Sequence, residues 1–277
     1  MTTDKRILIT NDDGVFSEGL KLLAEALAEV GRVTVVAPDR EQSASGHALT
    51  LHRPLRIRQL EETWFSVDGT PTDCVNLAVL WLMKDDPPDL VCSGINFGTN
   101  LGDDVTYSGT VSATFEGTLL GVPSLAFSQA IGEHFSFKPG AAVARDLVAQ
   151  LLTDELAHEL PEDLCLNVNF PVGEIQGVTF TRLGRRRYNQ SIVEKLDPRG
   201  RKYYWIAGAP EWEQGEGTDY VALSKGLVSV TPLHLDLTDY RGLETYGPLR
   251  ERLERVPAEL SPVPDPGPDG AHRGDDG

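Results

Sequence analysis

The stretch Ile7-Leu8-Ile9-Thr10-Asn11-Asp12-Asp13-Gly14 decides the fold that this sequence predicts. Its apolar start is typical of a buried strand, and a helical pattern with one apolar face begins at Ser17. Two adjacent carboxylates at the end of a buried strand are costly unless a cation compensates their charge. Ligands of open α/β sheets bind at such strand-to-helix turns, so this loop is expected to hold a hard metal ion.

The first part of the chain alternates between strand and helix patterns. Strands are expected at residues 7–10, 33–37, 89–93, 124–128 and 165–170. Helices are expected at residues 17–30, 72–84, 110–120 and 139–152, and a hairpin is expected across 48–67. This alternation predicts an α/β fold, with a Rossmann-like, doubly wound and mostly parallel sheet covered by helices on both faces.

The pattern changes after about residue 165, where short β segments replace the alternation. These segments are expected at residues 177–183, 187–195, 203–206, 219–224 and 227–232, and a last helix at 246–255. We expect one domain over 1–256, with a core to about residue 170 and a β-rich oligomerisation arm with a C-terminal helix over about 171–256. Residues 257–277 are rich in proline and glycine, which predicts a disordered tail.

The chain of 277 residues carries a net charge of −17, from 42 acidic and 25 basic residues. Such a surface repels nucleic acid backbones, so binding of a nucleic acid duplex is not expected. It also repels phosphate esters. A site for phosphate would therefore need local positive potential from a metal ion and from helix N-termini.

The sequence gives no indication of a membrane or of an oxidising compartment. No apolar stretch approaches the roughly 20 residues that span a bilayer, and the N-terminal residues lack a signal-peptide pattern. Cys74, Cys92 and Cys165 are widely spaced in apolar surroundings, which indicates core thiols rather than disulfides or metal ligands. We therefore expect a cytoplasmic protein that does not bind membranes.

Two further loops follow predicted strands of the same sheet. Ser43 lies in the polar loop after the second strand, and Asn96 lies in the glycine-rich loop after the strand at 89–93. The carboxyl ends of parallel strands meet at one edge, so these side chains can converge with Asp12 and Asp13. Carboxylate, hydroxyl and amide oxygens suit a single Mg²⁺ or Mn²⁺ ion, with Ca²⁺ as a further alternative, better than zinc or copper. Helix capping by Asp12 is the alternative that the residues alone leave open.

The glycine-rich loop is unlike a dinucleotide-binding fingerprint. Gly94, Gly98 and Gly102 are spaced differently from G-x-G-x-x-G, and the loop runs on before a helix begins. These glycines indicate unusual backbone angles or close approach of a ligand. Asn100 is expected to be a second polar contact in this loop.

A fourth loop, Tyr107-Ser108-Gly109-Thr110, leads into the next helix. Hydroxyls and a glycine at a helix N-terminus offer backbone N–H groups and a favourable dipole to an anion. Simple capping by Ser108 or Thr110 is the alternative. A phosphate site beside a hard metal is what hydrolysis of a phosphoester requires.

Together these motifs resemble the SurE family of survival proteins with nucleotidase activity. The resemblance spans about residues 6–235 and rests on these blocks, in the order of the family: 7–14, 36–40 with 43–47, 69–74, 93–100, 107–113, 218–219 and 228–233. It implies a metal-dependent phosphomonoesterase that acts on nucleoside 5′- and 3′-monophosphates. It places the metal on Asp12, Asp13, Ser43 and Asn96, and the substrate on Asn11, Asn100, Ser108, Gly109 and Thr110. It also implies a homodimer or homotetramer joined through the C-terminal β arms.

The resulting hypothesis is hydrolysis by a metal-activated water, with Asp12 and Asp13 as the catalytic residues. Both hold the metal, and one of them also orients or deprotonates the water. No residue is assigned as general acid.

A non-catalytic nucleotide-binding or sensor module is the alternative function. A dinucleotide-dependent oxidoreductase is disfavoured because the fingerprint is missing. The preferred base, the hydrolysis of short polyphosphate and the choice of metal stay open.

Overall fold

The computed structural model describes residues 4–153, 161, 163–188, 192–206, 210–213 and 215–254. The chain divides into two compact units, Met1–His234 and Leu235–Gly277. The second unit contains helices α7 (Tyr240–Thr245) and α8 (Gly247–Leu253). The predicted tail at 257–277 lies outside the described residues, and the single domain over 1–256 stays a prediction.

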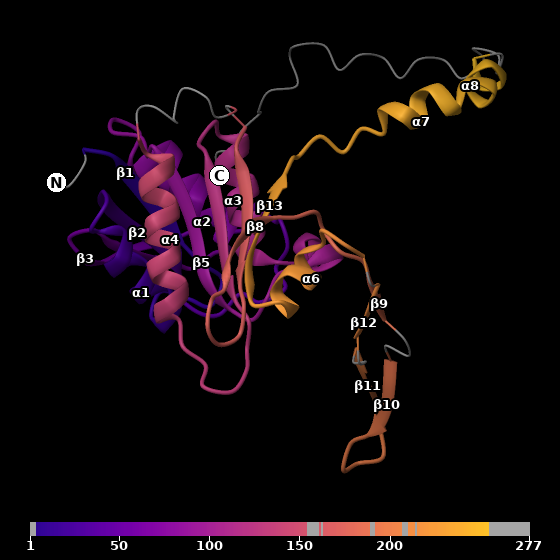
Figure 1. Ribbon diagram of the computed structural model, residues 1–277, viewed down its shortest axis with the longest axis horizontal. Coiled ribbons are helices and arrows are strands. Elements are labelled where there is room, and N and C mark those ends of the chain that lie inside the picture. The colour runs from indigo at the N-terminus through magenta and orange to yellow at the C-terminus, as the bar shows by residue number, and fades with distance from the viewer. Residues whose placement is uncertain are drawn as a thin grey trace, which may run out of the picture. The chain divides into compact units, whose positions relative to one another are not determined.

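A mixed sheet forms the centre of the first unit, and Figure 1 shows its strands between helices. Within the described residues the strand order is β3-β4-β2-β1-β5-β6-β7-β13-β8. The β3–β4 and β7–β13 pairs are antiparallel, and the other neighbours are parallel. The strands are β1 (Arg6–Thr10), β2 (Arg32–Pro38), β3 (Ile57–Glu61), β4 (Trp64–Val67), β5 (Leu90–Phe97), β6 (Ser124–Gln129), β7 (Cys165–Phe170), β8 (Gly177–Phe180) and β13 (Leu227–Leu233). The predicted α/β fold with a mostly parallel sheet is confirmed.

Helices cover both faces of this sheet. α1 (Glu18–Leu27) packs with α4 (Lys138–Leu151) on one face, and α2 (Pro71–Leu77) packs with α3 (Gly109–Leu119) on the other. A π-helical turn at Ala78–Leu82 continues α2. Side chains alternate along a strand, so Ile7 and Ile9 of β1 join the core under α1 and α4, whereas Leu8 joins the core under α2. The two-sided burial explains the uninterrupted apolar run at the start of the chain.

Helix α1 approaches the sheet very closely. Ser17 caps the helix by accepting a hydrogen bond from the N–H of Leu20, and the apolar face that follows is buried. Next to the cap, a Cβ on Gly19 would lie 2.0 Å from the carbonyl oxygen of Ile95 in β5. Only glycine fits at this position, and the contact fixes the first helix against the strand that carries Asn96.

One part of the predicted secondary structure is wrong. Residues 219–224, expected as a β segment, form helix α6 (Asp219–Ser224), because the hydroxyl of Thr218 caps the N–H of Val221. The aromatic and β-branched residues of this short segment favoured a strand, but the cap at Thr218 starts a helix.

The hairpin expected across 48–67 is confirmed over its second half, where β3 and β4 pair antiparallel.

The region after β8 forms two small ladders of its own. β9 (Arg186–Tyr188) pairs with β12 (Pro210–Trp212), and β10 (Ile192–Leu196) pairs with β11 (Lys202–Ile206). At their base, buried Asp219 accepts hydrogen bonds of 2.8 Å from the N–H groups of Gly102 and Gly184. These ladders correspond to the predicted arm, and its role in oligomerisation stays a prediction.

In the part of the chain that the structure describes, no helix combines the length and the apolar character needed to cross a membrane.

We predict that Gly19→Ala lowers the free energy of unfolding by about 2–3 kcal/mol, because the added methyl overlaps the carbonyl of Ile95. Urea denaturation of the variant measures this change. Gly247→Ala is the matched control, since a Cβ on this helical glycine meets open space. An unchanged unfolding free energy for Gly19→Ala would show that the helix and strand are not in tight contact.

Candidate functional site

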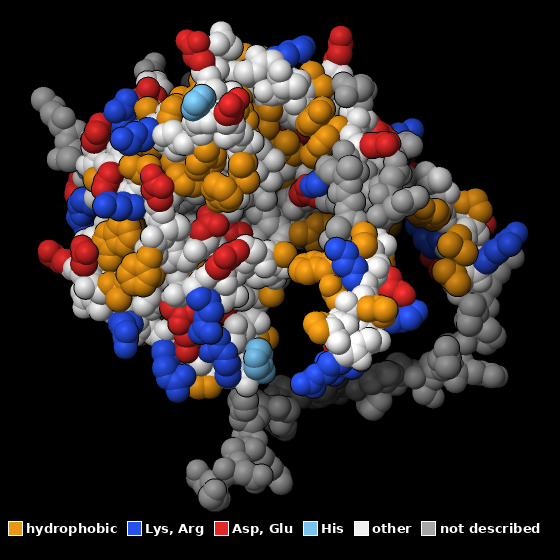
Figure 2. Space-filling model, turned by 90° about the horizontal axis from the view of Figure 1, so that it is seen from below, with side chains coloured by type: hydrophobic (Ala, Val, Ile, Leu, Met, Phe, Trp, Pro, Cys, Tyr) orange, Lys and Arg blue, Asp and Glu red, His pale blue; other side chains and the backbone are white. Residues whose placement is uncertain are grey.

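The candidate site lies where the strand order reverses. The chain runs from β1 outward to β2 and then returns to β5 on the other side of β1. The loops after β1 and β5 therefore leave the sheet side by side, at the position where α/β sheets bind ligands. Figure 2 looks onto this end of the sheet, and acidic side chains there lie next to hydrophobic ones.

Asp12 is buried against the first turn of α3, with a residue exposure of 5%. The hydroxyl of Thr110 donates a hydrogen bond to Asp12 Oδ1. A Cβ on Gly109 would lie 2.8 Å from Asp12 Cβ and 3.0 Å from Asp12 Oδ2. Burial raises the pKa of Asp12, and the hydrogen bond from Thr110 opposes this rise. The carboxylate is therefore held tightly in a place that disfavours its charge.

Asp13 lies beside the end of β5. Its Oδ2 atom accepts a hydrogen bond of 3.2 Å from the backbone N–H of Phe97. Burial, followed by the nearby charge of Asp12, raises the pKa of Asp13 to about 6, and Glu41 adds to the rise. Two adjacent carboxyl groups with raised pKa values form a site that a cation would stabilise.

The capping alternative for Asp12 does not hold for α1, because Ser17 caps that helix. Asn11 supports the cap: its Nδ2 donates to Ser17 Oγ at 2.7 Å and to the carbonyl of Gly14 at 3.0 Å. The Oδ1 atom of Asn11 is buried and has no hydrogen-bonding partner among the described residues. A buried acceptor without a partner, next to Asp12, indicates a missing ligand or water.

The loop after β2 lies against the first loop. The N–H of Gln42 donates to the carbonyl of Asp12 at 2.7 Å, and the N–H of Gly46 donates to the carbonyl of Tyr107 at 3.2 Å. Ser43 belongs to this loop, and its hydroxyl donates to Glu41 Oε1 at 2.6 Å. The structure thus brings the Ser43 loop to the site and directs the Ser43 hydroxyl to a neighbouring carboxylate.

Sequence reasoning did not single out Ser45 or Glu41. The Oγ atom of Ser45 is buried without a partner among the described residues, and it lies 2.8 Å from the position of a Cβ on Gly109. The negative charge of Glu41 raises the pKa of both aspartates of the site. No motif in the sequence marks either residue, because each becomes relevant only through the packing of this loop on α3.

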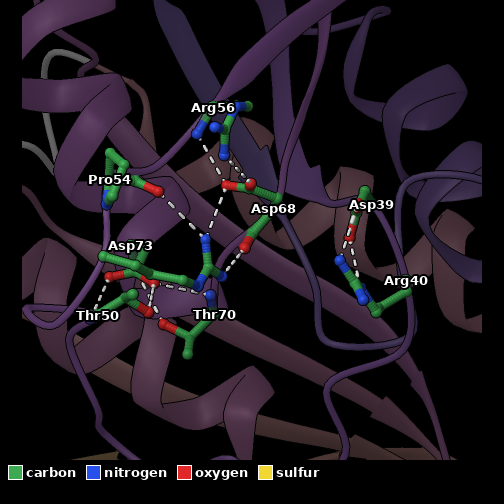
Figure 3. A network of polar contacts seen from close by, with 9 residues as sticks. Asp39, Arg40, Thr50, Pro54, Arg56, Asp68, Thr70 and Asp73 are labelled. Carbon is green, nitrogen blue, oxygen red and sulfur yellow. Dashed lines mark hydrogen bonds and ion pairs between the residues drawn. The ribbon is translucent and has the colours of Figure 1, made fainter.

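The chain after this loop is anchored to α2 and α3. Figure 3 shows Asp73 between Thr50 and Thr70: Asp73 accepts from the N–H and the hydroxyl of Thr50 at 2.8 and 2.6 Å, and from the N–H of Thr70 at 2.9 Å. His47 Nε2 and Glu116 Oε2 are 2.9 Å apart. Both ends of the segment 47–50 are therefore fixed, which holds the preceding loop over the site.

Figure 3 also shows ion pairs at the exposed side of this region. Arg40 pairs with Asp39 at 2.8 Å, and Arg56 pairs with Asp68 at 3.6 Å. These arginines are occupied by surface carboxylates, and exposed pairs of this kind contribute little to stability.

Asn96 and Asn100 occupy different environments in the glycine-rich loop. Asn96 is half-buried near the end of β5, and its Nδ2 donates to the carbonyl of Gly98 at 2.9 Å. This bond fixes the amide plane, and the amide oxygen is the atom that could bind a hard cation. Asn100 is buried, and its Nδ2 donates to Ser128 Oγ at 2.8 Å.

Two asparagines of β7 hold Asn100 in place, and sequence reasoning did not identify them. Asn167 and Asn169 both donate to the carbonyl of Asn100, at 2.8 and 3.0 Å, and Asn169 Oδ1 accepts from its N–H at 2.9 Å. Buried amides need partners, so two asparagines in an otherwise apolar strand are the signal that could have revealed these hydrogen bonds to Asn100.

The N-terminus of α3 faces the same site. Ser108 is the cap and accepts a hydrogen bond of 3.1 Å from the N–H of Val111. The early N–H groups of a helix lack intrahelical acceptors and carry its positive dipole end, so the N–H of Gly109 is a donor suited to an anion, whereas the N–H of Thr110 bonds to the Asp12 carboxylate. Capping by Ser108 and anion binding are compatible here.

The donor set decides which metal fits. Among the described residues, no three His, Cys, Asp or Glu side chains lie close enough together to hold a metal ion by themselves. The candidate ligands are therefore two carboxylates with neutral hydroxyl and amide oxygens, which suit Mg²⁺ or Mn²⁺. The unpartnered buried oxygens of Asn11 and Ser45 agree with a bound ligand at this place.

A family model, curated relatives and a solved structure all show similarity of this chain to SurE proteins. The family model described as "Survival protein SurE" matches residues 7–190. A protein of Myxococcus xanthus named 5′-nucleotidase SurE is 55% identical over 85% of this chain and 90% of its own length. One of Syntrophotalea carbinolica with the same name is 55% identical over 86% of this chain and 94% of its own length. The crystal structure of the SurE protein from Aquifex aeolicus superposes with a TM-score of 0.79, at 47% identity, over 88% of this chain and 99% of that one.

We predict that Asp13 makes the metal-free protein less stable as the pH rises. The folded-state pKa of about 6 lies above the ordinary value of 3.8, so the folded state holds the proton more tightly and loses stability as the pH rises between these values. Asp13→Asn should remove this part of the pH dependence. Calorimetric Tm values measured in chelator at pH 4 and pH 7 test it, with exposed Asp146→Asn as control. Equal pH dependence in wild type and Asp13→Asn would contradict the assignment.

Proposed function

The chain belongs to the SurE family and is a 5′-nucleotidase, and we propose that it hydrolyses its substrates with one divalent cation bound by Asp12, Asp13, Ser43 and Asn96. Nucleoside 5′-monophosphates are the substrates that the names of its relatives imply. The observation that supports the metal proposal is the pair of adjacent, largely buried carboxylates: Asp12 packs against the first turn of α3, and Asp13 accepts from the N–H of Phe97 at the end of β5.

A bound Mg²⁺ or Mn²⁺ would supply charge compensation for the phosphate and the carboxylates and would activate water as a nucleophile. The protein itself would hold the ligands of the cation in place. Asp12 is fixed by Thr110, and Asp13 is fixed by the N–H of Phe97, so both carboxylates have defined directions. Their raised pKa values agree with a site whose ionised carboxylates a cation would stabilise.

The phosphate would be held by the N-terminus of α3. The N–H groups of Gly109 and Thr110 and the hydroxyl of Ser108 would stabilise the charge that develops on the phosphoryl oxygens, and the N–H of Thr110 would be shared with Asp12. Asn11 and Asn100 would complete the proposed substrate site, Asn11 through its Oδ1 acceptor, since its Nδ2 already donates to Ser17 and Gly14. Because the whole chain carries a charge of −17, attraction of a phosphate ester depends on these local donors and on the cation.

The reaction would produce a nucleoside and inorganic phosphate. One of the two aspartates would orient or deprotonate the attacking water, since both are adjacent to the proposed phosphate position. We further propose that nucleoside 3′-monophosphates and short polyphosphates are hydrolysed, since the contacts proposed for Asp12, Asp13 and α3 engage the phosphate group alone.

A cytoplasmic location is proposed because Cys74, Cys92 and Cys165 are buried free thiols.

We predict that Asp12→Asn lowers kcat for phosphate release from adenosine 5′-monophosphate at least 100-fold, because it removes one of the two charged groups that hold the cation. Phosphate release with added Mn²⁺ or Mg²⁺ measures this effect, and a chelator should abolish the wild-type activity. Asp146→Asn on α4 is the exposed control. Full activity of Asp12→Asn, or resistance of the wild type to chelator, would contradict metal-assisted hydrolysis. Nucleotide binding without turnover would favour the sensor module.

We propose that the β10–β11 ladder joins subunits into a homodimer or homotetramer. Its large apolar side chains are exposed, including Ile192 at 67%, Tyr204 at 58% and Trp205 at 59%. Clustered exposed apolar groups on a short two-stranded ladder are typical of a surface that is covered by a partner.

This proposal predicts that Trp205→Glu lowers the molecular mass of the assembly, because a charge at this position opposes burial. Light scattering coupled to size exclusion measures the mass. Gln150→Glu, at an exposed position of α4 outside the ladder, is the control for added negative charge. An unchanged mass for Trp205→Glu would show that the ladder lies outside the subunit contact.

A further inference from the structure

Phe97 is a large aromatic residue that the fold leaves exposed at the edge of the candidate site. It is the last residue of β5, and 54% of it is exposed, whereas Ile95 two positions earlier is completely buried. Ile131 is also exposed, at 55%, and its Cδ1 atom lies 3.8 Å from the position of a Cβ on Gly98. Exposed apolar side chains that gather beside a polar site are typical of ligand-binding surfaces.

The position of Phe97 is fixed relative to the candidate metal ligands. Its backbone N–H donates to Asp13, and it directly follows Asn96 in the chain. On β6 its partner is Gln129, and the N–H of Gly98 donates to the carbonyl of Gln129 at 3.0 Å. The phenyl ring is therefore carried by the residue next to Asn96, a proposed ligand of the cation.

Other aromatic rings support the Phe97 side chain. Its ring meets Phe135 edge to face, with centroids 4.9 Å apart and an interplanar angle of 65°. Phe135 meets Phe137 in the same way at 4.8 Å, and Phe137 is buried at the start of α4. Such edge-to-face contacts hold a ring in one orientation. Phe97 is thus supported through Phe135 while more than half of it stays accessible.

We propose that Phe97, with Ile131 beside it, binds the base of the nucleoside monophosphate. This inference rests on the proposed function, which places the phosphate at Asp12, Asp13 and α3. The ribose separates the phosphate from the base, so the base meets a surface next to the phosphate site rather than inside it. All nucleobases have an aromatic face, and stacking on an aromatic side chain is tolerant of base identity. The platform would therefore accept every base and prefer purines, whose stacking area is larger.

Phe16 is the other strongly exposed phenylalanine near these loops, and its surroundings differ. It is 83% exposed and lines a pocket next to α1, together with Leu60 of the edge strand β3 and Trp64 of β4. No contact that the structure describes connects the Phe16 ring to Asp12, Asp13 or α3. Phe16 is therefore the matched control for loss of an exposed aromatic side chain.

The test compares Phe97→Ala, Phe97→Tyr and Phe16→Ala on two substrates, adenosine 5′-monophosphate and ribose 5-phosphate, which lacks a base. Steady-state phosphate release gives kcat and KM for each pair. We expect Phe97→Ala to raise the ratio of the two KM values (nucleotide over sugar phosphate) about tenfold, from the loss of one stacking contact. Phe97→Tyr, which keeps a ring, and Phe16→Ala should leave this ratio as in the wild type.

Three results would overturn the proposal. The first is an unchanged KM ratio in Phe97→Ala. The second is an equal loss with both substrates, which would indicate that the substitution disturbs Asp13. The third is the same change of the ratio in Phe16→Ala. If the wild type releases phosphate from neither ester, the proposed function fails. Calorimetric binding of the two esters to wild type and Phe97→Ala then tests the base platform separately.

Discussion

The contact between Asp12 and the first turn of α3 is the constraint on which the rest of the site depends. A buried carboxylate, the hydroxyl of Thr110 and the bare Cα of Gly109 occupy one small volume, where any side chain on Gly109 would overlap Asp12. The loop with Ser45 closes over the same volume. This packing joins the end of β1 to a helix N-terminus. It therefore places groups suited to a cation beside groups suited to an anion.

Electrostatics explain why such a site needs an additional charged component. Asp12, Asp13 and Glu41 concentrate negative charge in a protein whose net charge is already −17. Without a cation, burial and mutual repulsion raise the carboxyl pKa values, and a phosphate ester would be repelled. In the proposed function, the same carboxylates would be ligands of a bound cation, and the α3 amides would meet the phosphate. The protein would then contribute the positions of these groups, and most of the positive charge would come from the cation.

The sequence predicts the layout of the site better than its details. The apolar run at 7–9, the tandem aspartates and the glycines after β5 identify the sheet edge and two of its loops, because these signals are local. The hydrogen bonds from two β7 asparagines to Asn100 and the contact of Ser45 with α3 join residues far apart in the chain, so no local pattern reveals them. The segment 219–224 shows the same limit, since one cap outweighed its β-like composition. The sequence alone leaves capping and ligand binding open at Asp12, and only the structure shows that Ser17 is the residue that caps α1.

The most direct test of the central claim is the position of the cation itself. Anomalous diffraction from crystals of the wild-type protein grown with Mn²⁺ would locate the ion independently of any activity. The account predicts one strong peak within coordination distance of Asp12 and Asp13, on the side that faces Asn96 and the N-terminus of α3. A protein whose Mn²⁺ peaks lie only at surface carboxylates such as Asp39 or Asp68, with none at the tandem aspartates, would contradict it.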